Sequence, residues 1–532
     1  MISMKQSLTF ENLKNPTLYG PDVKSVNILQ THISYIALTG LYAYKIKKPV
    51  NFGFLDFSTL EKRKYFCEEE LKLNRRLCPE IYLKVVPISI KNNEIKINGD
   101  GQIIEYALKM NEFSQKNIMT RLLEQGKIDE IDMDNICNIL VDFYKYGEHS
   151  KEIDKYGTVD FVKKNTDENF EQTKSMINFT ITKEIFDFIK AKTNEFLDKY
   201  KEYFEDRIRK NCICDCHGDL HSGNIVVKDR KICIFDCIEF NKRFRYSDIT
   251  SDIGFLAMDL DYIGKPFLSS YFIYKYIEKS KDIGILDMLN FYKCYRAYVR
   301  GKVIGFRLDD PSFDKNDKKK IKESAEKYFE LAYYYAKLFS LCLRKTKPTL
   351  FITCGLTGTG KTTVAKKISI DYNAYFISTD SVRKELEGID KFEKHHDAYN
   401  TGLYSPEKML FTYKKILEKA DSLSGKGKNV ILDGTFKSKN IREMAKDIAK
   451  KNNANFLILF CSCPEMIVKK YLEKRVKKKS ISDGRWEIYL KQKDSFESFY
   501  NDEKIIEIDV SKNSYEYQID IFKKIYKSIN GV

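Results

Sequence analysis

Length, composition and charge set the first limits on this chain. Its 532 residues exceed what one hydrophobic core usually serves, so we expect two or three domains. Thirteen cysteines without a small-domain spacing favour the reduced thiols of a cytoplasmic protein over a disulfide framework, and the lack of any apolar run of about 18 residues argues against a membrane span. The formal charge of +16 would attract polyanions, but it does not choose among nucleic acids, nucleotides and phosphorylated substrates.

The first part of the chain, to about residue 110, carries short β-rich runs that predict an antiparallel sheet. These runs cover residues 33–38, 41–46, 81–90 and 102–108. One helix is predicted over residues 59–77, with Ser58 or Thr59 as its N-cap. A sheet with one long helix is typical of the small lobe of a kinase-like fold.

Helical periodicity covers residues 117–210 and, after a segment of short strands, resumes through Lys345, the last stretch being Asp314 to Leu343. These helices would form a large lobe. Pro348 follows several basic residues and favours a linker here, because a proline stops the helix before a new strand begins. The predicted organisation is a first domain with two lobes that divide near residue 110, a linker and a second domain: residues 1–343, 344–348 and 349–532.

Three cysteines alternate just before the main motif of the first domain. Cys212, Cys214 and Cys216, followed by His217, could suggest a zinc site. Zinc sites prefer C-x-x-C spacing, so the alternation favours three small side chains on one face of a strand.

A pattern typical of a kinase catalytic loop begins at His217. The run His217–Asn224 has H-x-D-x-x-x-x-N spacing, and Asp236 follows a short apolar strand. Phosphoryl transfer needs a carboxylate beside the acceptor hydroxyl, an amide ligand for one metal ion, and a second carboxylate that bridges Mg²⁺ to the phosphates. Asp219, Asn224 and Asp236 would fill these roles in that order. The alternative, an ordinary polar hairpin, is disfavoured because composition, interval and strand context agree.

This segment resembles the aminoglycoside phosphotransferase and choline kinase branch of the kinase-like fold, since Asp236 is not followed by the Phe-Gly of protein kinases. By that resemblance Lys45, in Y-A-Y-K, matches the lysine of the V-A-I-K strand and would bind the phosphates, although Lys47 lies on the same strand face. Its partner acid would be one of the glutamates at 68–70, with Glu70 preferred. The glycine-rich G-x-G-x-x-G loop of protein kinases is missing from this half of the sequence.

From residue 349 onward, strand and helix patterns alternate. Strand-like segments over residues 350–354, 374–378, 429–432 and 455–461 each precede a helix-forming segment. Such alternation predicts a parallel sheet with crossover helices.

A complete phosphate loop, G-x-x-x-x-G-K-[ST], joins the first of these strands to its helix. The glycine-rich turn lets backbone amides point at phosphate oxygens, and the helix N-terminus adds favourable partial charge. Lys361 would neutralise the β and γ phosphates, and the Thr362 hydroxyl would bind Mg²⁺. The residues expected to hold the nucleotide are Gly355, Gly358, Gly360, Lys361, Thr362 and Thr363.

Two carboxylates and a basic segment complete the second predicted centre. Asp433, at the end of an apolar strand, stands where a Walker-B acid would organise the metal ion. Asp380 follows the second strand and would accept the proton of a substrate hydroxyl, while Arg383 would hold an anionic group; helix capping is the alternative for Asp380. The basic segment 469–485 has the position of a mobile lid, in which Arg475 would stabilise charge on the transferring phosphoryl group, and a solvated basic helix is its alternative.

Residues 349–510 resemble the P-loop kinases of the gluconate, shikimate and polynucleotide kinase type, which carry D-x-x-R after the second strand. Nearly the whole chain resembles a family of fusion proteins that join an aminoglycoside phosphotransferase-like domain to a P-loop kinase-like domain, through runs such as 217–224, 234–241 and 245–248. The resemblance implies an α+β kinase-like bilobal domain followed by an α/β P-loop NTPase domain with a parallel sheet.

The function expected from these motifs is ATP-dependent phosphorylation of a hydroxyl on a small molecule, with ATP and Mg²⁺ as cofactors and two nucleotide-binding centres. A nucleic-acid end kinase, prompted by the charge and the basic segment, is a second prediction. A nucleotide-dependent regulatory protein with a degenerate kinase-like lobe is a third. Substrate pockets in both folds are built by variable loops, so the acceptor is predicted only as a class.

Overall fold

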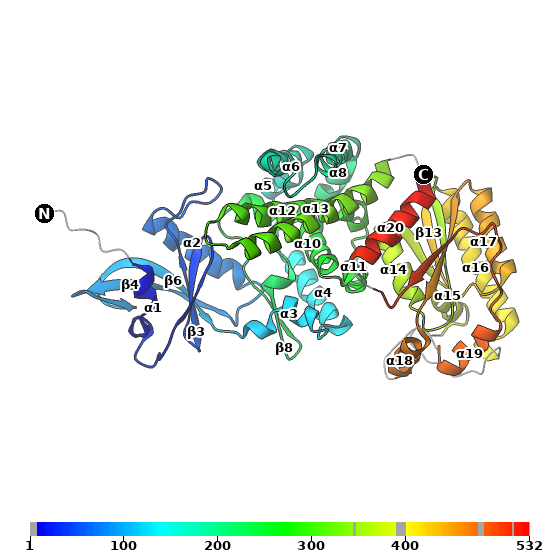
Figure 1. Cartoon of the computed structure of the whole chain (residues 1–532), viewed down its shortest axis with the longest axis horizontal. Coiled ribbons are helices and arrows are strands. Elements are labelled where there is room, and N and C mark those ends of the chain that lie inside the picture. The colour runs from blue at the N-terminus through cyan, green and yellow to red at the C-terminus, as the bar shows by residue number, and fades with distance from the viewer. Residues whose placement is uncertain (1–7, 344–346, 390–400, 477–483, 513–514, 531–532) are drawn as a thin grey trace. The chain divides into compact units, whose positions relative to one another are not determined.

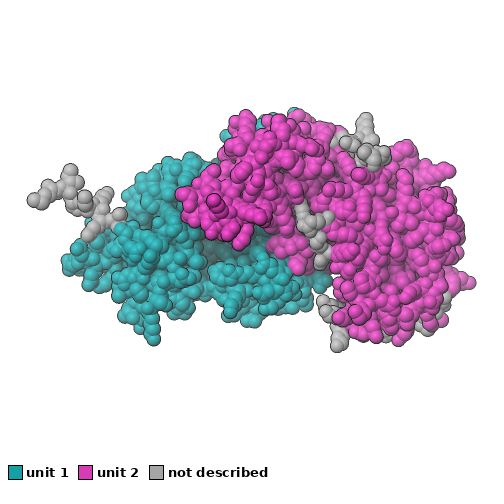
Figure 2. Space-filling view, in the orientation of Figure 1, with its two compact units in different colours: residues 1–167, 200–259 teal, residues 168–199, 260–532 magenta. Residues whose placement is uncertain are grey.

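The computed structural model describes residues 8–343, 347–389, 401–476, 484–512 and 515–530. Two compact units divide the chain (Figure 2): unit 1 comprises Met1–Asp167 and Tyr200–Asp259, and unit 2 comprises Glu168–Lys199 and Leu260–Val532. The last helices of the predicted large lobe thus belong to the unit that also contains the phosphate loop. Of the predicted linker, residues 344–346 lie outside the described residues.

A six-stranded antiparallel sheet forms the first part of unit 1 (Figure 1), with strand order β1-β2-β3-β6-β4-β5. The strands are β1 (Asn27–Gln30), β2 (Ser34–Leu38), β3 (Tyr42–Lys47), β4 (Tyr82–Lys91), β5 (Glu94–Ile97) and β6 (Gln102–Asn111). The predicted antiparallel sheet is confirmed. Strands β1 and β5 are absent from the prediction, because four residues are too few for an alternating pattern to stand out.

Helix α2 (Leu60–Asn74) packs against this sheet and confirms the one long helix predicted here. The Thr59 hydroxyl caps it by accepting a hydrogen bond from the Lys62 N–H at 3.3 Å. The helix ends three residues before the predicted Leu77. Its buried face carries Glu70, so this carboxylate needs a cationic partner on the sheet.

Further helices and two antiparallel strand pairs complete unit 1. The helices are α1 (Phe10–Lys14), α3 (Met119–Glu124), α4 (Glu130–Lys145), α5 (Lys151–Asp154), α8 (Lys201–Arg209) and α9 (Lys242–Arg245); α6 (Val159–Gln172) and α10 (Ile249–Tyr262) continue into unit 2. The strand pairs are β7 (Ile213–Asp215) with β10 (Tyr246–Asp248), and β8 (Ile225–Lys228) with β9 (Lys231–Ile234). Strand β7 confirms the strand predicted from the cysteine alternation, and Cys212, Cys214 and Cys216 are all buried.

One cysteine pair differs from the prediction of reduced thiols. Cys78 and Cys233 form a disulfide with their Cα atoms 5.0 Å apart, which joins the segment after α2 to β9. The prediction was wrong for this pair because its members lie 155 residues apart in the sequence, and only the fold brings them together.

Unit 2 contains helices of the predicted large lobe and a parallel five-stranded sheet. The helices are α7 (Lys183–Lys199), α11 (Pro266–Ser280), α12 (Ile285–Phe306) and α13 (Lys315–Leu343). The strands are β11 (Thr349–Cys354), β12 (Ala374–Ser378), β13 (Asn429–Asp433), β14 (Asn455–Ser462) and β15 (Ile505–Asp509), in the order β12-β13-β11-β14-β15. All four strand pairings are parallel, which confirms the predicted α/β P-loop fold.

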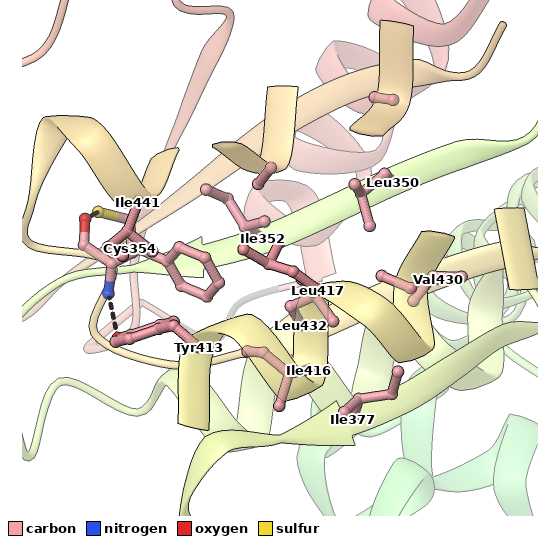
Figure 3. Close-up of a cluster of buried hydrophobic side chains, with 14 of the residues drawn as sticks. Leu350, Ile352, Cys354, Ile377, Tyr413, Ile416, Leu417, Val430, Leu432 and Ile441 are labelled. Carbon is pink, nitrogen blue, oxygen red and sulfur yellow. Dashed lines mark hydrogen bonds between the residues drawn. The ribbon is translucent and has the colours of Figure 1, made fainter. Parts of the chain in front are cut away.

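Helices connect these strands, and an aliphatic core lies between helices and sheet (Figure 3). The helices are α14 (Lys361–Asp371), α15 (Thr379–Leu386), α16 (Pro406–Gly425), α17 (Lys439–Lys451), α18 (Glu465–Val476), α19 (Trp486–Asp494) and α20 (Tyr515–Asn530). In the core, Leu350 and Ile352 of β11 and Leu432 of β13 pack with Ile416 and Leu417 of α16. Each such side chain contributes about 1.5–3 kcal/mol by leaving water, which fixes the loops at the strand ends. No helix within the described ranges has the length and apolar character needed to cross a bilayer.

Candidate functional site

Lys45 on β3 organises the kinase-like centre. Its Nζ lies 2.7 Å from Glu70 Oε1 of α2 and 2.7 Å from Oδ1 of Asp236, which follows β9. Burial lowers the pKa of Lys45, but the carboxylates of Asp236 and Glu70 outweigh burial and raise the pKa well above its ordinary value. Lys45 is therefore a cation held between the helix and the predicted metal ligand.

Lys47, the other lysine on this face of β3, has a different set of partners. Its Nζ lies 2.6 Å from Glu70 Oε2 and also bonds Glu239 Oε1, and its side chain is only 1% exposed. Lys45, which bonds Asp236, is 12% exposed. The geometry therefore favours Lys45 for the phosphates and makes Lys47 a buried partner of two acids.

Asp219 and Asn224 lie together in the loop between β7 and β8. The Asn224 Nδ2 donates to Asp219 Oδ2 and to the Asp219 carbonyl oxygen, each at 3.0 Å. His221 Nε2 lies 3.4 Å from Asp219 Oδ2, while His221 Nδ1 accepts a hydrogen bond from the Gly223 N–H at 3.0 Å. In the neutral ring that bond leaves the imidazole proton on Nε2, which faces the carboxylate. Sequence reasoning assigned His221 no role, because only its placement shows that it faces Asp219.

Helix α10 holds the backbone of this loop through two buried aspartates. Asp252 accepts hydrogen bonds from the N–H groups of His217 at 2.6 Å and Gly218 at 3.0 Å. Asp259 accepts one from the Ser222 N–H at 2.9 Å. Sequence reasoning missed both aspartates, since they lie more than 30 residues from their partners and belong to no local motif.

Asp236 adopts a strained backbone conformation that aims its carboxylate at Lys45. Its φ angle is +63°, in the left-handed region that is costly for residues other than glycine, although aspartate and asparagine enter it more often than most. The Asp236 N–H donates to the Tyr82 hydroxyl at 3.2 Å, and the next N–H, of Cys237, donates to Asn74 Oδ1 at 2.8 Å. Such strain is held in place by surrounding contacts and is common at functional sites.

The phosphate loop forms the second centre, between β11 and α14. Gly355, Gly358 and Gly360 all have positive φ angles, of 136°, 81° and 80°. Lys361 begins α14, and its Nζ donates to the Leu356 carbonyl oxygen at 2.6 Å. Thr363 follows on the same helix, with its N–H bonded to the Gly360 carbonyl oxygen at 3.0 Å. The local backbone therefore has the glycine turn before a helix that the motif predicts, a conformation in which successive amides can face an anion.

Thr362 and Asp433 meet at the base of this loop. The Thr362 hydroxyl donates to Asp433 Oδ2 at 2.7 Å, and the Thr353 hydroxyl donates to Asp433 Oδ1 at 3.3 Å. Burial raises the pKa of Asp433 above its ordinary value, against the lowering effects of Thr362 and Lys361. A hydroxyl and a carboxylate side by side are ligands that Mg²⁺ prefers, so the donor set fits the predicted metal ion.

Asp380 and Arg383 lie together in α15. Arg383 Nη1 donates to Asp380 Oδ1 at 2.8 Å, and the guanidinium lies 4.6 Å from the centre of the Tyr404 ring. Arg383 is 4% exposed, and its Nε has no hydrogen-bond partner among the described residues. Asp380 lies in the first turn of α15, but the helix has no side-chain cap bond. Arg475 lies on α18, with its side chain outside the described residues, as is part of the basic segment.

The comparisons with known proteins cover both halves of the chain. A family model described as an AAA domain matches residues 350–499, which include the phosphate loop and Asp433. A gluconokinase from Sinorhizobium meliloti is 16% identical, with a TM-score of 0.26, and the match covers 35% of this chain and 96% of that one. An amicoumacin kinase in complex with AMP-PNP is 12% identical, with a TM-score of 0.35, and the match covers 57% of this chain and 88% of that one.

Mycobacterial proteins are similar to this chain over most of its length. The uncharacterized protein Rv2004c of Mycobacterium tuberculosis is 30% identical over 441 residues, which covers 83% of this chain and 84% of the relative. The uncharacterized protein Mb2027c of Mycobacterium bovis matches to the same extent. The chain belongs to the family of these mycobacterial proteins, and its residues 350–499 match the AAA domain model.

Proposed function

We propose that the protein is an ATP-dependent phosphotransferase that phosphorylates a hydroxyl group of a small molecule and uses two nucleotide-binding centres. The observation that carries this proposal is the contact of the Thr362 hydroxyl with Asp433, directly beside Lys361 and its glycine-rich turn. A cation, a hydroxyl and a carboxylate at one loop supply what phosphate binding and metal binding need.

In the phosphate-loop centre, Lys361 and the loop amides would bind the phosphates of ATP, and Thr362 with Asp433 would hold Mg²⁺, which neutralises phosphate charge when bound. Asp380 would accept the proton of the acceptor hydroxyl. The hydroxyl oxygen would then bond the γ-phosphorus while the bond from that phosphorus to ADP breaks. Arg383 would orient an anionic group of the acceptor, since its buried guanidinium has an Nε left to donate. ADP and a phosphate ester are the products.

In the kinase-like centre, Asp219 would take the acceptor proton, and Asn224 and Asp236 would hold Mg²⁺. Lys45 would bind the phosphates from its position between Glu70 and Asp236. The contacts of Asp219 with Asn224 and His221 support an active centre rather than a degenerate one, because each neighbour fixes the carboxylate in place.

The test is a screen of metabolite pools with γ-labelled ATP, run on the wild type, Asp219→Ala and Lys361→Ala. We expect labelled small molecules with the wild type. Each variant should lose a distinct labelled product, or the product of a subsequent phosphorylation step. Magnesium-dependent ATP binding without any labelled product would instead support a regulatory protein. The absence of magnesium-dependent ATP binding to the full chain would refute the proposal.

A further inference from the structure

The outer turn of the phosphate loop lies against two helices that come more than 100 residues later in the chain. Leu356 packs with Val468 and Leu472 of α18 and with Tyr489 of α19. A Cβ atom at Gly358 would lie 2.9 Å from side-chain carbons of Leu472 and Val468, so the loop backbone rests directly on α18. The shape of this turn therefore depends on α18 and α19 as well as on its own glycines.

One side chain of α19 bonds the loop backbone. The Thr357 N–H donates to Gln492 Oε1 at 2.8 Å, across 135 residues of sequence. Helix α19 is held against α18, because Lys493 Nζ lies 3.0 Å from Glu465 Oε2 and Tyr489 packs with Val468 and Leu472. Gln492 is thus a neutral acceptor on an anchored helix, bonded to the middle of the outer turn.

We propose that Gln492 is a positioning residue that holds the phosphate loop in its anion-binding shape and raises the affinity for the phosphates of ATP. The inference rests on the proposed function of the phosphate-loop centre. A loop whose amides are already aligned binds an anion without first losing backbone entropy, so an anchor at Thr357 strengthens binding without touching the ligand. A neutral amide suits this position, since a carboxylate would bond the N–H more strongly but repel the phosphates.

The test compares Gln492→Ala and Gln492→Glu with Glu487→Ala, a control on an exposed position of the same helix. Calorimetry on the full chain measures binding of MgATP and of inorganic tripolyphosphate. The part of the binding signal that Lys361→Ala removes is assigned to the phosphate-loop centre. We expect Gln492→Ala to lower the affinity for both ligands by about 3- to 10-fold, the range that one hydrogen bond represents. The control should bind both ligands as the wild type does.

Gln492→Glu separates positioning from simple packing. It keeps an acceptor for the Thr357 N–H, so the emission of Trp486, the sole tryptophan, should stay as in the wild type. Its charge should nevertheless weaken both ligands, and this loss should shrink as salt is raised. Wild-type affinity in both Gln492 variants, or a loss for ATP but not for tripolyphosphate, would overturn the inference.

Amide hydrogen exchange tests the anchor without any ligand. The peptide that contains Thr357 should exchange faster in Gln492→Ala than in the wild type or in Glu487→Ala, because the amide loses its acceptor. Equal exchange would overturn the inference. If the wild type exchanges slowly at Thr357 but binds no MgATP, the proposed function fails while the anchor stands.

Discussion

The two lysines of β3 allow nucleotide binding and stability to be separated. Lys47 is 1% exposed, and it bonds Glu70 and Glu239, which are buried as well. Lys47→Met would leave Glu239 as a buried carboxylate without that cation. Breaking a buried ion pair from one side costs about 3–5 kcal/mol. For a unit of this size that loss corresponds to a melting temperature lower by about 6–20 °C.

Lys45→Met should have the opposite profile. Glu70 would still bond Lys47, and Asp236 is half-exposed, so the stability loss should be smaller. Magnesium-dependent ATP binding at the kinase-like centre should disappear, because Lys45 is the cation beside the predicted metal ligand. Differential scanning calorimetry measures the loss of stability, and isothermal titration calorimetry with MgATP measures nucleotide binding.

The pH dependence and a double variant supply the controls. Burial raises the pKa of Glu239 above its ordinary value, and removing Lys47 would raise it further. An acid whose folded pKa is raised destabilises the fold only when ionised, so the penalty is absent at low pH and grows as pH rises through that pKa. Lys47→Met should therefore lose less stability at pH 5 than at pH 8, and Lys47→Met/Glu239→Gln should recover most of it. Loss of ATP binding in Lys47→Met with unchanged stability would refute this reasoning.

Substitutions at three further positions test single features of the two units. Gly358→Ala places a Cβ in a left-handed backbone against α18. It should lower the affinity for MgATP by more than about tenfold in calorimetry without global unfolding, and wild-type affinity would contradict this. Arg207→Met removes two bonds, of 2.8 and 2.9 Å, to the buried Asp248; it should cost about 3–5 kcal/mol in urea unfolding, and a loss below about 1 kcal/mol would count against it. His221→Leu should lower turnover at the kinase-like centre more than His221→Gln, which keeps a donor toward the carboxylate. Equal turnover in the wild type and both variants would show that His221 has no role.

Sequence patterns predicted the parts of each centre that are local in the chain. The phosphate loop is eight residues between a strand and a helix, and the spacing of Asp219 to Asn224 sets their contact within one turn. Partners that come from distant elements could not be predicted from sequence patterns. Gln492, which bonds Thr357, and Asp252, which bonds the loop at His217, are examples. A single glutamine or aspartate on a helix carries no pattern, and only the fold gives it a neighbour.

The choice between Lys45 and Lys47 shows the same limit at closer range. Alternation placed both side chains on one face of β3, which is correct, but it could not tell their partners apart. The difference arises because Asp236 and Glu239 lie three residues apart after β9, so each lysine bonds a different one.

The predicted linker marks a boundary in sequence pattern, but the contacts of unit 2 extend across it. Asp371, at the end of α14, accepts hydrogen bonds from Lys367 Nζ at 2.7 Å and from the Tyr334 hydroxyl of α13 at 3.2 Å, and its carbonyl oxygen accepts one from Asn290 of α12 at 3.0 Å. A fragment 349–532 would expose this buried carboxylate and lose both partners from α12 and α13.

Fragment 260–532, which keeps those helices, should therefore be more stable than fragment 349–532. Two buried hydrogen bonds contribute about 1–3 kcal/mol, and the packing of Tyr334 against Phe522, 4.6 Å apart, adds to this. Thermal unfolding of the two fragments measures the difference, with Tyr334→Phe in the longer one as a control that removes one bond and keeps the ring. Equal melting temperatures would mean that the phosphate-loop domain is independent of α12 and α13. A higher melting temperature for the longer fragment would mean that helices of the predicted large lobe also support the helix that begins with Lys361.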